Sequence, residues 1–242
     1  MMSSPNAGSY GADLAVDDHA VLDELPSTSQ GERAYARIRG DIVFGKLKPG
    51  QKLAIERTKD TYQTSVGTLR EILNRLASEG LVAAEGARGF EVMPISPDNL
   101  RQVAAMRQLL EANALRESFA AGDIDWEGRV VAAHHKLAAI EKRMALGDRS
   151  GAETWKRYDW EFHHALISAC GSAVLLETHS AIYDKYLRYQ MISGVYRGEV
   201  ASREHRKLLD AALARDWEGA QKTMHKHVQD CVEHMIGAGL IR

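Results

Sequence analysis

The sequence predicts a mainly α-helical protein with two parts: a small N-terminal domain of three helices and a β-hairpin, and a C-terminal antiparallel bundle of six helices. Three observations lead to this fold class. Helical periodicity dominates the chain after residue 30, glycines and prolines interrupt it at short intervals, and β-type runs occur only around Glu85 to Gly89. With 242 residues, 45% of them hydrophobic, the chain is large enough for one or two globular cores.

The formal net charge of −2 hides an uneven distribution of charge along the chain. Residues 1–30 carry five acidic residues and no Lys or Arg, and they show no sustained periodicity, so we expect a disordered acidic tail. Residues 31–97 carry eleven Lys and Arg against eight Asp and Glu, a net +3, and the remainder of the chain is balanced. This modest basic excess gives weak support to nucleic-acid binding.

Other compositional features concern the compartment. No apolar run approaches membrane-spanning length, and the N-terminus has no signal pattern. Cys170 and Cys231 lie far apart inside helical patterns, which favours reduced, buried thiols over a disulfide. We therefore expect a soluble cytoplasmic protein without a membrane partner.

The N-terminal domain is expected over residues 31–95. A capping box at Ser29 and Glu32 starts a helix that runs to about residue 44, a Pro-Gly turn follows, and a short helix covers residues 55–62. The third helix, at about residues 65–79, begins at the N-cap Ser65 and ends at Gly80. A Gly-rich hairpin then carries Arg88. This order predicts a winged helix-turn-helix whose third helix presents Thr68 and Arg70 to solvent.

The C-terminal domain is expected over residues 96–242, after a linker at Met93–Pro97. Short breaks separate six helical patterns, and helices joined by short loops pack antiparallel. The patterns cover about residues 98–121, 125–146, 151–170, 173–193, 198–214 and 217–236.

Four residues of this bundle have the chemistry of metal ligands. Asp159 and His163 are four residues apart, so both project from one helix face, and His205 and His227 lie on later helices. Imidazole and carboxylate together suit zinc and neighbouring divalent ions, and four protein ligands leave coordination positions open. On spacing alone, however, an Asp and a His four residues apart more often form a hydrogen bond on a helix surface.

The N-terminal motifs resemble the DNA-binding domain of the GntR superfamily of bacterial regulators. FGKLKPGQKL, SVGTLREILNRLASEGLV and ARGFEV occur in that order and cover about residues 33–95. The resemblance implies that the third helix reads the major groove of operator DNA while the wing reaches the minor groove. By position, it assigns the DNA contacts to Ser65, Thr68, Arg70, Gly86 and Arg88.

The sequence departs from this family pattern at two places. Val66 stands where the family usually has an Arg, and Gly67 follows where a Thr is common, so one expected contact is missing. Glu56 takes a position that is often basic, and Arg57 is the candidate to replace it.

The C-terminal motifs resemble the FCD effector domain of the FadR-like branch. These motifs are D-x-x-x-H followed by LISACG, then EHRKLLDAAL-x-RD and a terminal M-x-x-H, and six helices point to the VanR-type group. The resemblance implies that Asp159, His163, His205 and His227 hold a divalent metal, with zinc favoured over nickel, manganese or iron, and that a small carboxylic acid binds at or beside it. Arg107, in R-x-x-x-E, is the candidate to neutralise the acid. An intrahelical pair with Glu111 is an equally good explanation of Arg107.

These patterns favour a homodimeric, metabolite-responsive repressor rather than an enzyme. The two N-terminal domains of the dimer would bind the half-sites of a near-palindromic operator, and the effector would change how these domains are arranged. Two alternatives remain open at this point: a metal-dependent hydrolase or oxygenase that uses the Asp and three His residues, and a regulator whose metal is purely structural.

Overall fold

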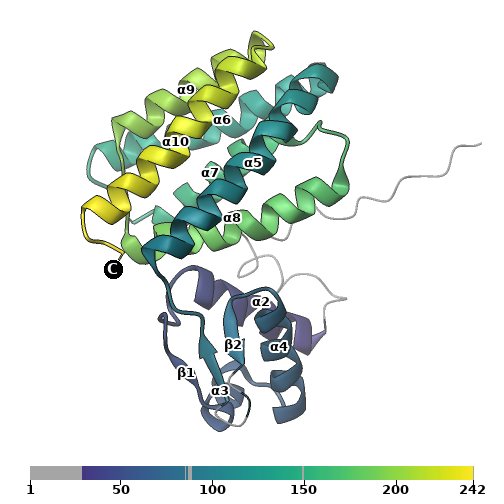
Figure 1. The fold of residues 1–242 in the computed structure, drawn as a ribbon, viewed down its shortest axis with the longest axis vertical. Helices are drawn as coiled ribbons and strands as arrows, with labels where there is room; N and C mark the ends of the chain where they lie inside the picture. Colours follow the sequence, from purple (N-terminus) through teal and green to yellow (C-terminus); the bar gives the residue numbers. More distant parts are fainter. Residues whose placement is uncertain (1–28, 85, 87–88, 149, 242) are drawn as a thin grey trace, which may run out of the picture.

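The computed structural model describes residues 29–84, 86, 89–148 and 150–241, and this part of the chain is mainly helical (Figure 1). The expected acidic tail lies outside the described residues, apart from Ser29 and Gln30. The N-terminal part, which we call the head, contains α2 (Gln30–Val43), β1 (Lys52–Leu53), α3 (Ile55–Tyr62), α4 (Val66–Ser78), β2 (Val82–Ala84) and β3 (Phe90–Val92).

The caps in the head form as the sequence predicts. Ser29 and Glu32 make a complete capping box at α2, and Ser65 caps α4 by accepting a hydrogen bond from the Thr68 amide. One prediction was wrong: the turn around Pro49 and Gly50 was expected to cover residues 47–53, but Lys52 and Leu53 form β1, which pairs antiparallel with β3 in the order β1-β3-β2. A two-residue strand is too short to show a period of two, and only its pairing with the wing makes it a strand.

The second part is a bundle of six helices, and the fold class predicted from the sequence is confirmed. Its helices are α5 (Pro97–Ala121), α6 (Ile124–Ala145), α7 (Ala152–Ile167), α8 (Ala173–Ser193), α9 (Glu199–Leu213) and α10 (Trp217–Gly237). The expected breaks at Gly122, Gly147 and Gly171 all lie between helices. Within the described residues, no helix is long and apolar enough to cross a membrane.

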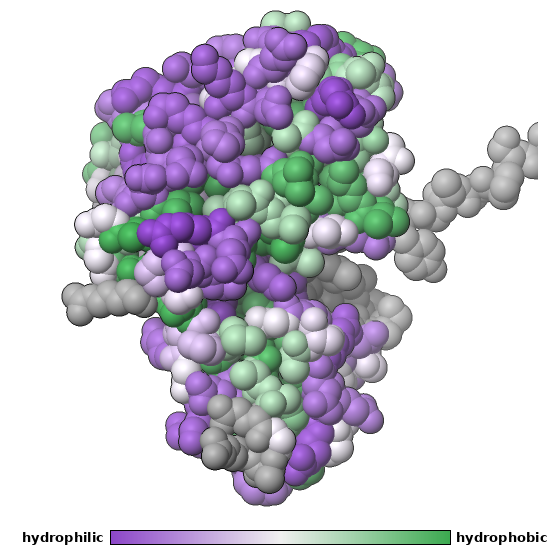
Figure 2. Space-filling model, in the orientation of Figure 1, coloured by the Kyte–Doolittle hydropathy of each residue, from purple (hydrophilic) through white to green (hydrophobic). Residues whose placement is uncertain are grey.

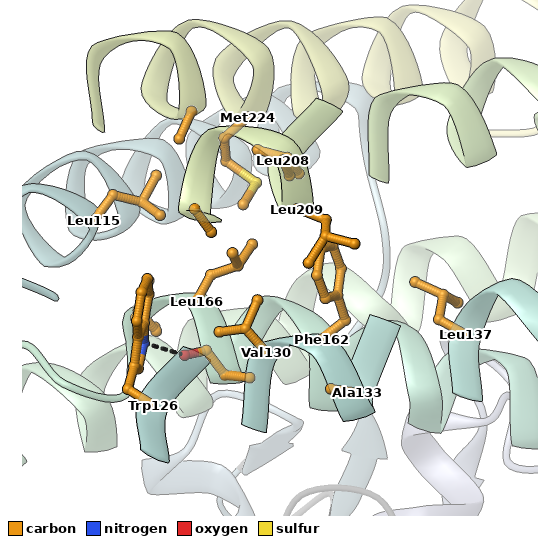
Figure 3. Packing of buried hydrophobic residues seen from close by; sticks show 14 of the residues in the cluster. Leu115, Trp126, Val130, Ala133, Leu137, Phe162, Leu166, Leu208, Leu209 and Met224 are labelled. Carbon is orange, nitrogen blue, oxygen red and sulfur yellow. Dashed lines mark hydrogen bonds between the residues drawn. The ribbon is translucent and has the colours of Figure 1, made fainter. Parts of the chain in front are cut away.

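Apolar side chains from α5, α6, α7, α9 and α10 form the core of the bundle (Figure 3). Trp126 is fully buried in this core, and its indole nitrogen donates a hydrogen bond to the carbonyl of Ala165 over 2.9 Å. Because a buried indole needs a partner for its N–H, this bond joins α6 to α7 at a defined register. The three helices that carry candidate ligands, α7, α9 and α10, all contribute side chains to this core.

His134, on α6, makes the stability of the bundle depend on pH. Its ring is 4% exposed and packs edge-on against Phe162, and burial lowers the pKa of His134 to about 4. Between pH 6.5 and pH 4 this histidine is therefore protonated in the unfolded chain but not in the folded chain. The contribution of His134 to the free energy of unfolding is fully present above pH 6.5 and is lost as pH falls through this range. We expect the unfolding free energy to fall by about 1–2 kcal/mol less between pH 7 and pH 5 in His134→Leu than in the parent, measured by urea titration. An equal fall in the two proteins would contradict this role.

The head packs directly on α8, which forms the side of the bundle that faces it (Figure 1). Trp160, Tyr183 and Leu187 of the bundle belong to the same buried cluster as Ile38 and Leu73 of the head. Figure 2, drawn from the same side as Figure 1, shows apolar residues across the middle of the molecule, whereas the upper part of the bundle is mainly hydrophilic. The two parts therefore share one buried hydrophobic contact.

Candidate nucleic-acid interface and metal centre

The solvent-facing side of α4 carries the residues expected to contact DNA. Ser65 is exposed, and its hydroxyl lies 2.9 Å from that of Thr68. Arg70 is exposed and makes no hydrogen bond or ion pair with any described residue. An unpaired guanidinium on a helix that projects from the head has its donors available for phosphate or base edges.

The second arginine of α4 is held differently. The Arg75 guanidinium lies 3.7 Å from the centre of the Tyr35 ring, and its Nε is 3.5 Å from Glu79. These contacts favour a structural role for Arg75 and leave Arg70 as the stronger candidate. Of the remaining predicted contacts, Arg57 is exposed on α3 and Gly86 is exposed with a φ of 57°, while Arg88 lies outside the described residues.

The bundle brings together all four residues that the sequence singled out as possible metal ligands. Asp159 and His163 come from α7, His205 from α9 and His227 from α10, and each is buried. One ligand atom from each lies within 4.8 Å of the ligand atoms of the others. Oδ1 of Asp159 lies 3.3 Å from Nε2 of His205 and 3.9 Å from Nε2 of His163, separations that a divalent ion with ligand distances near 2 Å can bridge.

Three of the four side chains of this cluster are oriented by an outer partner. Glu141 lies 2.8 Å from Nδ1 of His205, and Glu204 lies 2.8 Å from Nδ1 of His227. The Tyr183 hydroxyl donates to Oδ2 of Asp159 over 2.8 Å. A carboxylate that accepts the Nδ1 proton leaves Nε2 as the lone-pair nitrogen, which is the arrangement of histidines that ligate metals.

Two buried atoms of the cluster have no hydrogen-bond partner among the described residues: Nε2 of His163 and Nε2 of His205. An unsatisfied buried nitrogen is costly, and a metal ion at the centre of the cluster would satisfy it. The donor set of one carboxylate and three imidazoles therefore fits a divalent metal.

The charges of the cluster respond to its burial. Burial opposes ionisation of Asp159, but Lys156 and the neighbouring histidines hold its pKa well below the usual value. Burial lowers the pKa of His227 to about 4. Burial has the same effect on His205, but the carboxylates of Asp159 and Glu141 outweigh it and raise the pKa of His205 to about 9. Without a metal, a proton on His205 would therefore provide the positive charge that the carboxylates require.

Comparison with known proteins agrees with this arrangement of head and bundle. The family described as "Bacterial regulatory proteins, gntR family" matches residues 30–92, and the FCD domain matches residues 102–230. The HTH-type transcriptional regulator BphR of Paraburkholderia xenovorans is 36% identical over 241 residues, which cover 99% of this chain and 98% of BphR. The chain belongs to the GntR family.

Other GntR-family proteins extend the comparison. The HTH-type transcriptional repressor GlaR of Escherichia coli is 30% identical over 200 residues, which cover 80% of this chain and 90% of GlaR. The structure of E. coli McbR/YncC superposes with a TM-score of 0.72 at 19% identity, covering 88% of this chain and 99% of McbR, and supports the fold alone. Because the matched GntR family, BphR and GlaR are transcriptional regulators, this GntR-family chain is a DNA-binding regulator and not an enzyme.

Arg107 forms the intrahelical pair that its sequence context allowed, and it also contacts a candidate metal ligand. It is 1% exposed; its Nε donates to Glu111 over 2.8 Å, and its Nη2 lies 3.3 Å from Nδ1 of His163. The intrahelical pair thus exists, and the guanidinium also touches a candidate ligand of the FCD domain. Sequence reasoning missed His179, which is fully buried and lies 3.1 Å from Glu111. No spacing in the sequence relates His179 to Glu111.

Proposed function

We propose that this GntR-family regulator is a homodimeric repressor, with residues 31–95 binding operator DNA and residues 96–242 binding a small carboxylic acid at or beside a divalent metal. Zinc is the favoured ion, and nickel, manganese or iron are alternatives. The buried cluster of one Asp and three His residues, with two unsatisfied imidazole nitrogens, carries the proposal. The name of the relative GlaR, a repressor, supports the sign of regulation. A regulator of this kind acts in the cytoplasm, with the DNA.

Asp159, His163, His205 and His227 would hold the metal, and Glu141 and Glu204 would keep two of the imidazoles in the ligating tautomer. When bound, the ion supplies a Lewis-acidic position for a carboxylate oxygen. The protein contributes the fixed ligand geometry and a buried, poorly hydrated setting, in which a charged ligand is recognised strongly.

The contact between Arg107 and His163 supports a role for Arg107 in binding the acid. A guanidinium only donates, so Nδ1 of His163 accepts in this contact. If His163 ligates a metal through Nε2, Nδ1 of the neutral ring must carry the proton and can no longer accept. Nη2 of Arg107 then lacks an acceptor in a buried site, which the carboxylate of an effector would provide.

Helix α8 offers a route from this site to the DNA. Two adjacent residues on α8 contact opposite sides: Tyr183 bonds the candidate ligand Asp159, and Asp184 forms a buried ion pair with Arg39 of the head. Arg39 also lies 3.3 Å from Glu79, which is the C-cap of the DNA-reading helix α4. We infer that effector binding moves α8 and, through Arg39 and Glu79, changes the position of α4.

Removing one hydroxyl tests this route. In Tyr183→Phe the ring stays but the donor to Asp159 is lost. At saturating zinc we expect unchanged operator affinity without effector, and at least a fivefold smaller loss of affinity when effector is added. Fluorescence anisotropy with labelled operator measures both quantities. Tyr186→Phe is the matched control, because its hydroxyl contacts the Val228 carbonyl at 3.4 Å and the Cys231 thiol, neither of which belongs to the candidate metal centre. A full effector response in Tyr183→Phe would show that α8 does not carry the signal through this bond.

The function itself is tested by selecting duplexes from a random pool with the zinc-loaded full chain and titrating the winners with candidate acids. We expect a near-palindromic operator, binding by two copies of the chain, and weaker binding when the right acid is present. Absence of sequence-selective binding, with or without metal, would overturn the proposal.

A further inference from the structure

Two adjoining spaces lie beside the candidate metal centre. An outer groove of about 550 Å³ runs along the ends of α7, α8 and α10, and an inner cavity of about 10 Å³ borders Asp159, His205 and His227. Four residues line both spaces and so separate them: Trp155, Lys156, Gln190 and Val195. The outer groove has the volume of a small-molecule site, whereas the inner cavity holds about one water.

Lys156 is the cation that faces this boundary. Its side chain is 4% exposed, and its Nζ lies 3.5 Å from Oδ2 of Asp159 and 3.9 Å from the centre of the Trp155 ring. A dication bound by Asp159 would compete for the same carboxylate and would repel the ammonium group. An anion between the ion and Lys156 removes that repulsion. Arg107 lines neither space, so a carboxylate that enters from the groove meets Lys156 first and reaches Arg107 only after the side chains around the inner cavity shift.

The buried charges around the cluster specify the charge of this anion. Among the side chains around the cluster that are at most 10% exposed, three cations face four carboxylates: Arg107, Lys156 and Arg197 against Glu111, Glu141, Asp159 and Glu204. Asp230 also lies 3.5 Å from Arg197, but its side chain is 34% exposed and solvent screens its charge. With neutral imidazoles, a divalent ion turns the excess of one negative charge into an excess of one positive charge. Because uncompensated charge is costly in a buried site, a monoanion fits better than a dianion.

The outer groove indicates what the rest of the ligand is like. Most of its lining is apolar, including Met144, Ala152, Trp155, Met191 and Leu240. At the boundary, Oε1 of Gln190 is buried and has no hydrogen-bond partner among the described residues. An apolar body in the groove gains from leaving water, whereas a second carboxylate there would lose its hydration.

We propose that the effector is an amphipathic monocarboxylic acid that reaches the metal centre from the outer groove, pairs its carboxylate with Lys156 and leaves its apolar body among the groove side chains. This inference rests on the proposed function and narrows its effector class. Dicarboxylic and sugar acids are expected to bind more weakly, since their polar ends would lie in a groove whose lining is mostly apolar, although Ser193 and His234 also border it. The inner cavity is too small for a carboxylate as it stands, so Trp155, Lys156 and Gln190 must shift when the acid enters.

Calorimetric titration of the zinc-loaded full chain with four probes tests this inference: acetate, octanoate, suberate and gluconate. We expect octanoate to bind about 30-fold more tightly than acetate, because its chain is buried in the groove, and about tenfold more tightly than suberate of equal length. Gluconate should bind no better than acetate. Lys156→Met, which keeps the length of the side chain without its charge, should weaken octanoate at least tenfold, whereas zinc should bind at least as tightly as in the parent because the ammonium group no longer competes for Asp159.

A second variant fills the groove without touching the inner cavity. Ala152→Phe, at the first residue of α7, should weaken octanoate at least tenfold and leave acetate unchanged. Glu153→Phe is the matched control, since the neighbouring residue does not line the groove. Equal affinity for acetate and octanoate, or octanoate binding that survives Lys156→Met, would overturn the inference and leave the proposed function standing. Failure of every acid to bind the zinc-loaded protein would overturn both.

Discussion

His205→Ala will remove high-affinity zinc binding, with a loss of at least about 100-fold in affinity. His205 supplies one of only four clustered donors, is fully buried and has a carboxylate partner that orients it, so no described neighbour can replace it. In the parent, zinc at 100 times its Kd should stabilise the fold by about 2.7 kcal/mol, and this gain should vanish in the variant. Calorimetry measures the affinity, and thermal unfolding with and without zinc measures the gain.

His225→Ala is the control for this experiment. His225 is exposed on the same helix as His227 and lies outside the cluster, so zinc binding should be unchanged. If His205→Ala bound zinc as the parent does, the cluster would not be the metal site. If the variant lost zinc and stability but kept a normal effector response at the operator, the metal would be purely structural.

Arg70→Ala will weaken operator binding about 100-fold, the second large effect. Arg70 is the arginine of α4 whose donors no described residue uses, and a well-placed arginine contact with a base contributes about 1–3 kcal/mol. Fluorescence anisotropy against the selected operator measures the loss. A contact to phosphate alone would instead lower affinity for all sequences alike and reduce the salt dependence by about one ion.

Arg75→Ala serves as the matched control on the same helix. Because Arg75 stacks on Tyr35 and pairs with Glu79, its removal should cost stability more than operator affinity. Equal operator affinity in Arg70→Ala and the parent would mean that another face of α4 meets the DNA.

The sequence predicted those features that short-range physics controls. The boundaries of α3 were predicted correctly, and those of the longer helices to within a few residues, because caps such as Ser65 and breaks such as Gly122 act within a few positions along the chain. The grouping of Asp159, His163, His205 and His227 was predicted from a family motif, since nothing in their spacing of 42 and 22 residues brings the later helices together.

Features that depend on contacts between distant segments were not predicted. Glu141 and Glu204 were indistinguishable from surface acids until the fold placed them against His205 and His227. Lys156 is a similar case, because lysines are seldom buried and only the neighbouring Asp159 and Trp155 explain its position. Which buried charges pair with each other depends on how the helices assemble. The hydrophobic periodicity of a single helix therefore cannot predict these pairs.

The ion pair between Arg39 and Asp184 also limits how this protein can be engineered. A chimaera that grafts the head of another GntR-family protein onto this bundle would place a foreign residue opposite Asp184, a carboxylate that is 1% exposed. Without an arginine at the position of Arg39, that acid would be buried without its cation, and the junction would be destabilised. A biosensor that combines this bundle with DNA-binding domains from other proteins therefore needs two residues of the present head to be kept in each grafted domain: Arg39 and its partner Glu79.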